Sequence, residues 1–314
     1  MKLLITRPLP AAVMDAARAR FEVTARPETL PLTPDELRAS LRDFDAVLPT
    51  LGDLYRADVF ADVPNPRARI LANFGVGFNH IDVPAARAAG LQVTNTPGAV
   101  TDATADIALM LILMTARRAG EGERLVRAGL WQGWHPTQML GLHVSGKALG
   151  IIGMGRIGKA IARRAHHGFG MQILYHNRSP AEPGLPARAV PLPEAMAADV
   201  VVVVVPGGAS TRHLINAETL AQMKPHALFI NISRGDVVDE EALVRALQTD
   251  QIAGAGLDVY EQEPKIHPAL LTMENVTLLP HLGTAALEVR SAMGLMALDN
   301  LIALAENLPL PNPV

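Results

Sequence analysis

The chain has 314 residues, of which 49% are hydrophobic and 19% are charged, and its formal net charge is -3. This composition is typical of a folded protein, and a chain of this length usually divides its core between two domains. The small net charge argues against nucleic acid or an anionic membrane as a partner, and the absence of cysteine excludes disulfides, thiolate metal sites and a thiol nucleophile.

The N-terminus does not resemble a secretory signal, and the longest apolar stretch is too short for a membrane-spanning helix. The first ten residues, MKLLITRPLP, contain an apolar run that is too short for a secretory signal. Residues 107–115 form the longest apolar stretch, which is about half of what a membrane-spanning helix needs. We expect a buried helix there, suited to pack on a second subunit, and a cytoplasmic protein with no membrane partner.

Short runs of apolar and β-branched residues recur along the chain, and helical stretches separate most of them. The predicted strands lie near residues 3–6, 21–25, 45–49, 68–73, 91–95, 149–153, 172–176, 200–205, 227–233, 255–259 and 276–280. The clearest helices cover residues 11–20, 34–43, 158–168 and 240–249. Continuous apolar strands that alternate with helices predict parallel sheets covered on both faces, which is the α/β doubly wound class.

From Ala285 the sequence predicts a single helix that runs to the C-terminus. Its apolar stripe is formed by Leu295, Leu298, Ile302 and Ala305. A lone terminal helix must bury this stripe, and packing on the first α/β unit would make that unit discontinuous.

Two Rossmann-like domains follow from these elements, because a new strand begins near residue 149 after one α/β unit is complete. We expect the first domain from residues 1–98 and 285–314, and the second from residues 99–284. The two connections between them would form a hinge. Residues 180–193 are expected to form a proline-rich loop.

A glycine turn with Gly153, Gly155 and Gly158 joins an apolar strand to an amphipathic helix. In a dinucleotide-binding turn the first glycine permits the tight bend, the second lets the backbone approach a pyrophosphate, and the third lets the helix pack on the strand. The N–H groups of Arg156 and Ile157 would then face the phosphates. A glycine-rich connection without a ligand is the alternative, but the strand–turn–helix context favours dinucleotide binding. Residues 99–284 are therefore expected to form a dinucleotide-binding Rossmann domain, and residues 1–98 and 285–314 a flavodoxin-like substrate domain.

The segment about 20 residues beyond this turn predicts which dinucleotide is bound. NAD-binding chains usually carry an acidic residue there, but this sequence has Asn177, Arg178 and Ser179. A guanidinium would pair with a 2′-phosphate, and the two small side chains would donate hydrogen bonds to it. We therefore predict NADP(H) as the preferred cofactor, with NAD(H) used less well. The alternative is that Arg178 is a solvated loop cation.

Polar residues follow three later strands, at the edge where parallel sheets bind ligands. Arg234 would bind a carboxylate and polarise the adjacent carbonyl, and His281 would donate a proton as hydride reaches the carbon. Asp258, Glu261 and Glu263 lie between them, and a carboxylate beside the imidazole would stabilise its protonated form. Each residue alone has an ordinary structural explanation, but their joint placement after a glycine turn predicts a 2-oxoacid reductase.

Several ordered motifs resemble the D-2-hydroxyacid dehydrogenase family, and within it the glyoxylate/hydroxypyruvate reductases. The motifs are NFGVGFNHID, TNTPGAVTDATADIALML, GKALGIIGMGRIGKAIARR, INISRGDVVDEEAL, GLDVYEQEP and LLPHLGTAA. The resemblance implies that Arg234 binds substrate and that Glu263, rather than Glu261, pairs with the catalytic His281. It also implies that Asp258 holds the nicotinamide carboxamide, for which the alternative role is a turn cap.

The same resemblance implies further contacts. The backbone N–H groups of Val76 and Gly77 would bind the substrate carboxylate, a use that glycine-rich backbone also suggests by itself. Additional cofactor contacts are expected from Thr104, Pro206, Thr211, Ile232, His281 and Gly283. Leu51 and Phe78 are candidate walls of the substrate pocket.

The segment GLWQGWHPTQMLG resembles the part of related reductases that reaches into a neighbouring subunit. Trp134 stands at the matching place, so it would close the substrate pocket of the partner in a homodimer. An ordinary interface aromatic or a core aromatic is the alternative, since large rings are common in both environments.

The sequence thus predicts an NADPH-dependent enzyme that reduces glyoxylate to glycolate and hydroxypyruvate to D-glycerate. A reductase of bulkier 2-oxoacids such as phenylpyruvate is an alternative, and phosphoglycerate dehydrogenase fits less well because NAD would be expected. A further alternative is a dinucleotide-sensing binding protein similar to the corepressors of this family. The complete set of Arg234, Glu263 and His281 argues against this alternative and for an enzyme. The ten histidines show no zinc-type spacing, so no metal site is expected.

Overall fold

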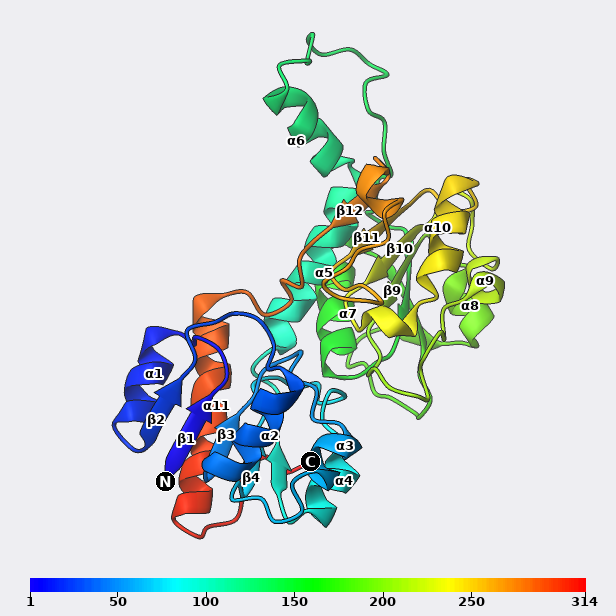
Figure 1. The fold of residues 1–314 in the computed structure, drawn as a ribbon. Coiled ribbons are helices and arrows are strands. Elements are labelled where there is room, and N and C mark those ends of the chain that lie inside the picture. Colours follow the sequence, from blue (N-terminus) through cyan, green and yellow to red (C-terminus); the bar gives the residue numbers. More distant parts are fainter. The chain divides into compact units, whose positions relative to one another are not determined.

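The computed structural model describes all residues from 1 to 314 and divides into two compact units. The first unit comprises residues 1–100 and 284–314, and the second comprises residues 101–283. Each unit contains one parallel sheet with helices on both faces (Figure 1). The predicted α/β doubly wound fold class is therefore confirmed.

The first unit has a five-stranded sheet in the order β2-β1-β3-β4-β5. Its strands are β1 (Lys2–Ile5), β2 (Glu22–Ala25), β3 (Ala46–Leu48), β4 (Ile70–Ala72) and β5 (Gln92–Thr94). Alternate side chains point to opposite faces, so Leu3 and Ile5 contribute to one core and Leu4 to the other. The strand order changes direction between β1 and β3, which makes this the switch point of the sheet.

Five helices cover this sheet. One face carries α1 (Ala11–Arg18) and α11 (Leu287–Ala305), and the other carries α2 (Pro34–Asp43), α3 (Ala57–Ala61) and α4 (Val83–Ala88). Thr33 begins α2 with a capping box, because its hydroxyl accepts from the N–H of Glu36 while the Glu36 carboxylate accepts from the N–H of Thr33.

The terminal helix differs from its prediction in length and in orientation. It ends at Ala305, because prolines at 309, 311 and 313 cannot continue a helix, and the tail returns to pair Pro313 with Thr94 of β5. The predicted apolar stripe is partly wrong: Leu295 is 42% exposed and Ala305 is exposed. The buried residues of α11 are Met293, Gly294, Ala297, Leu298, Asn300, Leu301 and Ala303. Packing against α1 and the sheet, rather than helical periodicity alone, selects this face.

The second unit has a seven-stranded sheet in the order β12-β11-β10-β9-β6-β7-β8. Its strands are β6 (Ala148–Ile152), β7 (Gln172–His176), β8 (Ala187–Ala189), β9 (Val200–Val203), β10 (Leu228–Asn231), β11 (Gly254–Leu257) and β12 (Val276–Leu278). The prediction missed β8, which lies inside the expected loop 180–193. This edge strand has the short, largely unburied sequence ARA, so it carries no apolar signal.

Helices α5 (Thr101–Ala116) and α7 (Arg156–Phe169) cover one face of the second sheet. The other face carries α8 (Leu192–Met196), α9 (Ala217–Leu220) and α10 (Glu240–Gln248). The 3₁₀ turns η1 (Gly235–Val237) and η2 (Leu270–Thr272) follow strands β10 and β11, respectively. Most of the stretch 107–115 is buried within α5, as predicted. None of the helices combines the length and apolarity that a membrane span requires.

Candidate active site

Gly153 and Gly155 of the predicted phosphate-binding turn lie between β6 and α7, and Gly158 lies in the first turn of α7, at the switch point of the second sheet. Gly153 has φ +107°, and a Cβ there would lie 2.7 Å from the carbonyl oxygen of Val204. A Cβ at Gly158 would overlap the carbonyl oxygen of Gly153. A Cβ at Gly155 would meet no protein atom within 4 Å. The fold therefore requires the first and third glycines, whereas the open space at Gly155 fits the close approach of a ligand.

The first turn of α7 is arranged to favour an anion. It contains no acidic residue, and it begins with Arg156, which is exposed and makes no ion pair. A cation at the positive end of a helix dipole is unfavourable unless an anion is nearby, and the free N–H groups of a first turn are donors for phosphate. These features fit the pyrophosphate of a dinucleotide.

The segment after β7 has one fixed and two exposed side chains. Asn177 Oδ1 accepts from the N–H of Met154 at 3.1 Å, and Asn177 Nδ2 donates to the carbonyl oxygen of Ser179 at 2.7 Å. Asn177 thus ties this loop to the glycine turn, a role that the sequence did not suggest. Arg178 and Ser179 are exposed, and Arg178 makes no hydrogen bond or ion pair with the protein. Their contact with a 2′-phosphate stays a prediction.

The structure pairs His281, which follows β12, with Glu263, which follows β11. His281 Nδ1 lies 2.9 Å from Glu263 Oε2, and Glu263 Oε1 accepts from the N–H of Tyr260 at 3.1 Å. When Nδ1 carries the proton of this bond, Nε2 is the ring nitrogen left to face a substrate. His281 has φ +53°, a conformation uncommon outside glycine, and its N–H donates to the carbonyl oxygen of Asp258 at 3.0 Å.

Arg234 belongs to the same electrostatic cluster. Burial lowers its pKa, and the charges of Glu263 and Asp236 act in the opposite direction. Burial by itself would raise the pKa of Glu263, but the hydrogen bond and charge of His281, the N–H of Tyr260 and the charge of Arg234 outweigh it, so the pKa is lowered. Glu263 is therefore an ionised carboxylate near neutral pH. A cation, an anion and an imidazole thus lie together at the carboxyl ends of β10, β11 and β12.

Glu261 has a different partner, although it is only two residues away. Its Oε1 lies 2.7 Å from His213 Nε2 and 3.3 Å from Arg212 Nη2. The structure therefore separates the two glutamates, with Glu263 on His281 and Glu261 on His213.

Asp258 acts as a cap in the structure. Its carboxylate accepts from the N–H of Leu282 at 2.6 Å and from the N–H of Gly283 at 2.8 Å, which fixes the loop that carries His281. Burial raises the pKa of Asp258, although these hydrogen bonds and the charge of His281 act in the opposite direction. Thr104 Oγ1 donates to the carbonyl oxygen of Gly283 at 3.1 Å. The structure thus brings Thr104, Asp258 and Gly283 together, and their contacts with a cofactor stay predictions.

The remaining expected cofactor residues lie around the same sheet edge. Thr211 Oγ1 donates to the carbonyl oxygen of Pro206 at 2.7 Å, which closes the loop after β9. Ile232 is 6% exposed and packs in the core, so little of its side chain is left for a ligand. Sequence reasoning missed Gly207, where a Cβ would lie 2.7 Å from Cγ of Arg234. The tandem glycines after Pro206 were the available signal.

In the first unit, Val76 and Gly77 lie in the loop after β4. Asn73 Nδ2 donates to the carbonyl oxygens of Gly75 and Gly77, both at 3.0 Å, and Asn95 Nδ2 donates to that of Val76 at 2.8 Å. The carbonyl oxygens are thus held by amide side chains, while the N–H groups of Val76 and Gly77 donate to no protein acceptor. This loop fits an anion. Sequence reasoning missed Asn73, whose position at the head of NFGVGF was the only signal.

Leu51 and Phe78, the two candidate pocket walls, lie in this unit as well. Leu51 is partly exposed in the loop after β3, and Phe78 is 37% exposed in the loop after β4. Both side chains have surface available for a ligand, and their part in a substrate pocket stays a prediction.

Trp134 lies in the segment that follows α6 (Ala119–Arg127) and is 79% exposed. No residue of α6 is buried, and Leu130, Trp131 and Leu140 are also exposed. Figure 1 shows α6 and this segment extending from the rest of the second unit. The core-aromatic alternative for Trp134 is therefore wrong, because the segment leaves the core. An apolar surface of this kind is typical of a protein interface.

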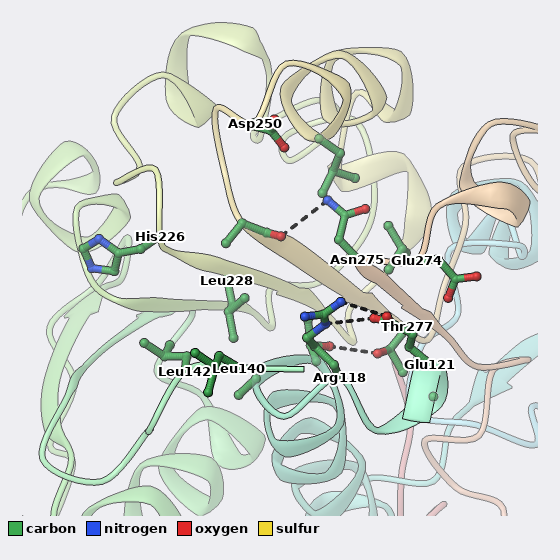
Figure 2. A pocket seen from close by; sticks show the side chains of 17 residues that line it. Arg118, Glu121, Leu140, Leu142, His226, Leu228, Asp250, Glu274, Asn275 and Thr277 are labelled. Carbon is green, nitrogen blue, oxygen red and sulfur yellow. Dashed lines mark hydrogen bonds and ion pairs between the residues drawn. The ribbon is translucent and has the colours of Figure 1, made fainter. Parts of the chain in front are cut away.

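A pocket of about 650 Å³ lies at the other end of the second sheet (Figure 2). Its lining includes Thr115 at the end of α5, Leu228 at the start of β10 and Val276 at the start of β12. Arg118 and Glu121 form an ion pair in its wall. None of the predicted site residues lines this pocket. No group of three or more His, Cys, Asp or Glu side chains in the structure is arranged to hold a metal ion.

Comparison with known proteins identifies the family. The model of the D-isomer specific 2-hydroxyacid dehydrogenase NAD binding domain matches residues 109–283. A glyoxylate reductase of Thermococcus onnurineus is 45% identical over 96% of this chain and 92% of its own length, and one of Pyrococcus furiosus is 44% identical over 96% and 91%. An NADPH-dependent glyoxylate/hydroxypyruvate reductase from Sinorhizobium meliloti, solved with NADP and malonate, is 38% identical with a TM-score of 0.88 over 100% of this chain and 96% of its own. The second unit is thus a nicotinamide-dinucleotide-binding domain, and the chain is an oxidoreductase that belongs to the D-isomer specific 2-hydroxyacid dehydrogenases.

Proposed function

We propose that this enzyme reduces small 2-oxoacids with NADPH, converting glyoxylate to glycolate and hydroxypyruvate to D-glycerate. The observation that carries the proposal is the 2.9 Å bond between His281 Nδ1 and Glu263 Oε2, beside Arg234 and on the same sheet as the glycine turn. This arrangement offers a proton donor, a group that stabilises its charge and a carboxylate-binding cation. Relatives named as glyoxylate reductases support the choice of substrate.

Each residue has a defined task in this proposal. A bound nicotinamide would supply a hydride for the carbonyl carbon of the oxoacid. His281 donates a proton from Nε2 to the carbonyl oxygen, and ionised Glu263 stabilises the imidazolium before the transfer. Arg234 binds the substrate carboxylate through two N–H groups and polarises the carbonyl. The free N–H groups of Val76 and Gly77 serve as further donors to the carboxylate.

Preference for NADPH rests on the loop after β7. This loop has no acidic residue to accept from a ribose hydroxyl, and Arg178 is exposed without a protein partner. A guanidinium in this place gains a strong charge-assisted pair with a 2′-phosphate, whereas NADH offers it no such group. Because cellular NADP is largely kept reduced, the enzyme would work in the direction of reduction.

We also propose a cytoplasmic homodimer. The exposed apolar side chains of Leu130, Trp131, Trp134 and Leu140 lie on a segment that has no core of its own. A second copy of the chain would cover these side chains, and Trp134 would then close the substrate pocket of the partner. Size-exclusion chromatography with light scattering tests the dimer, and Trp134→Ala tests the pocket through a raised KM for the oxoacid.

Initial rates with glyoxylate, hydroxypyruvate and phenylpyruvate, each with NADPH and with NADH, test the proposed function. We expect the highest kcat/KM with the two small oxoacids and NADPH. A clear preference for phenylpyruvate would assign the enzyme to bulkier substrates. The absence of turnover with every pair would refute the proposal.

A further inference from the structure

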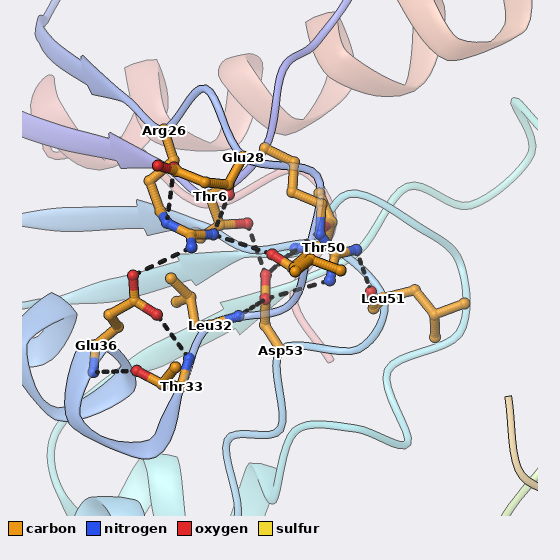
Figure 3. Close-up of polar contacts among 11 residues, drawn as sticks. Thr6, Arg26, Glu28, Leu32, Thr33, Glu36, Thr50, Leu51 and Asp53 are labelled. Atoms are coloured by element: carbon orange, nitrogen blue, oxygen red, sulfur yellow. Dashed lines mark hydrogen bonds and ion pairs between the residues drawn. The ribbon is translucent and has the colours of Figure 1, made fainter. Parts of the chain in front are cut away.

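A buried carboxylate stands at the switch point of the first sheet. Asp53 follows β3 and is 0% exposed, and its Oδ2 accepts from Thr6 Oγ1 at 2.6 Å and from the N–H of Thr50 at 2.9 Å. Thr6 directly follows β1, so the carboxylate links the ends of the two strands between which the order reverses (Figure 3). Parallel sheets usually bind ligands at such a point, outside the carboxyl ends of the strands. Here a side chain of the protein fills it.

Both oxygens of Asp53 accept a hydrogen bond from a backbone N–H group. Oδ1 accepts from the N–H of Leu32 at 3.0 Å and lies 3.6 Å from Arg7 Nη2. The Arg7 side chain is 18% exposed, and its Nη1 donates to the carbonyl oxygen of Leu51. A buried ion pair is weak evidence for stability, because desolvating both charges costs about as much as their attraction returns. The network is therefore better explained by the backbone geometry that it fixes than by a gain in stability.

One branch of the network fixes the loop that holds Leu51. Arg7 binds the carbonyl oxygen of this residue, and the next residue, Gly52, has φ +98°. A Cβ at Gly52 would lie 3.0 Å from Arg7 Nη2, so the backbone passes directly against the guanidinium. Leu51 is thereby held at the surface of the loop, where it is proposed to form a wall of the substrate pocket.

The other branch reaches the proposed carboxylate-binding loop. Thr50, held by Asp53 through its N–H, pairs with Phe74 in a parallel bridge, and the N–H of Phe74 donates to the carbonyl oxygen of Pro49 at 2.9 Å. Phe74 begins the loop that carries the free N–H groups at positions 76 and 77. A shift at Asp53 would therefore move both loops together.

We propose that Asp53 and Arg7 are positioning residues that set the affinity of the enzyme for its oxoacid without touching it. They hold residues 50–52 and 74–78 in the geometry that binds the substrate. This inference rests on the proposed function, because it takes these loops to face the oxoacid.

Asp53→Asn tests the proposal with little change in side-chain size. Both oxygens of Asp53 face donors, so the amide turns an N–H group toward a donor whichever way it is oriented. We expect the KM for glyoxylate to rise about tenfold, which corresponds to about 1.4 kcal/mol. The KM for NADPH should stay within about twofold and kcat within about threefold of the unaltered enzyme, since the cofactor and the proton donor belong to the second unit.

A matched control lies at the opposite end of the same strand. Asp45 precedes β3, and its carboxylate also binds an arginine and a backbone N–H, at 2.7 Å to Arg67 Nε and 2.6 Å to the N–H of Lys2. Asp45→Asn should lower the melting temperature and leave both KM values unchanged. A purely structural role of Asp53 would give the same pattern.

Arg7→Lys provides a second test that does not depend on the folding of Asp53→Asn. A lysine keeps the charge but lacks the two separate guanidinium nitrogens, Nη1 and Nη2, with which Arg7 reaches Leu51 and Asp53, so the glyoxylate KM should rise about threefold. The proposal is overturned if neither variant raises the glyoxylate KM. It is also overturned if the KM for NADPH rises as much as that for glyoxylate, or if Asp45→Asn raises the glyoxylate KM as much as Asp53→Asn does. Failure of the unaltered enzyme to reduce any oxoacid would refute the proposed function instead.

Discussion

Replacing Glu263 with glutamine should lower kcat/KM for glyoxylate by about 30-fold. The bond from His281 Nδ1 to Glu263 Oε2 is 2.9 Å long, and a hydrogen bond to a charged group contributes about 1.5–3 kcal/mol. At about 1.4 kcal/mol per tenfold, this range corresponds to about 10- to 150-fold. The two side chains are 31% and 32% exposed, so solvent screening moves the estimate toward the lower part of the range.

A measurement of the folded fraction separates this effect from loss of folded enzyme. The pKa of Glu263 is lowered although burial acts in the opposite direction, so the carboxylate is ionised near neutral pH in the unaltered enzyme. Glutamine keeps the size of the side chain and can still accept from the N–H of Tyr260, so the variant should stay folded at the assay temperature while kcat/KM falls. Partial unfolding would instead lower kcat/KM in proportion to the folded fraction, as circular dichroism would show.

Glu261→Gln is the control, because Glu261 lies in the same loop but contacts His213. This variant should keep kcat/KM within about threefold of the unaltered enzyme. Equal losses in the two variants, or a Glu263→Gln enzyme with nearly full activity, would refute the assignment of Glu263 as the partner of the proton donor.

Three further predictions concern the second unit. Arg178→Ala should raise the KM for NADPH about tenfold or more and leave the KM for NADH within about twofold, as initial rates would show. Equal effects on the two KM values would exclude the 2′-phosphate contact. Gly155→Ala should fold normally but weaken NADPH binding, as fluorescence titration would show. Gly158→Ala should lower the melting temperature, because a Cβ at position 158 would overlap the backbone and a Cβ at position 155 would not. Burial raises the pKa of Asp199, but hydrogen bonds from Lys224, from a histidine and from a backbone N–H outweigh it, so the pKa is lowered. The resulting stability is present above about pH 4 and is lost as the pH falls further. Asp199→Asn should therefore lower the free energy of unfolding, measured with urea, by about 2 kcal/mol at pH 7 and by progressively less in acid. A loss that does not change with pH would contradict this account.

The parts of the fold that could be predicted are those with a local signal. Strands buried on both faces are continuous apolar runs, as Val200–Val203 shows, and eleven of the twelve strands were predicted in this way. The missing strand β8 lies at an edge, where one neighbour and solvent exposure allow a polar sequence. The face of α11 was misjudged for a related reason. Its mostly apolar sequence offers several possible stripes, and only the contact with α1 selects one.

The same distinction separates the predicted site residues from the missed ones. Arg234 and His281 stand directly after strands, and the carboxyl ends of parallel strands meet at one edge, so the sequence alone could place them together. The sequence could place Asn177 near the expected cofactor site, but it could not predict the bond of Asn177 to Met154, which depends on how two loops pack. Asp53 and Thr6 are 47 residues apart, and no periodicity or motif links them. Only the strand order brings them into contact.

The two sheets use their switch points in opposite ways, and this contrast fits a division of labour within the enzyme. At the second sheet Gly155 leaves the space above the turn open, as a large dinucleotide needs. At the first sheet Asp53 and Arg7 close the equivalent place with charged side chains that hold the neighbouring loops. A small oxoacid offers few atoms for binding, so its affinity depends strongly on pre-organised donors rather than on contact area. In the proposed reductase, a filled switch point beside the free N–H groups of Val76 and Gly77 would meet this requirement.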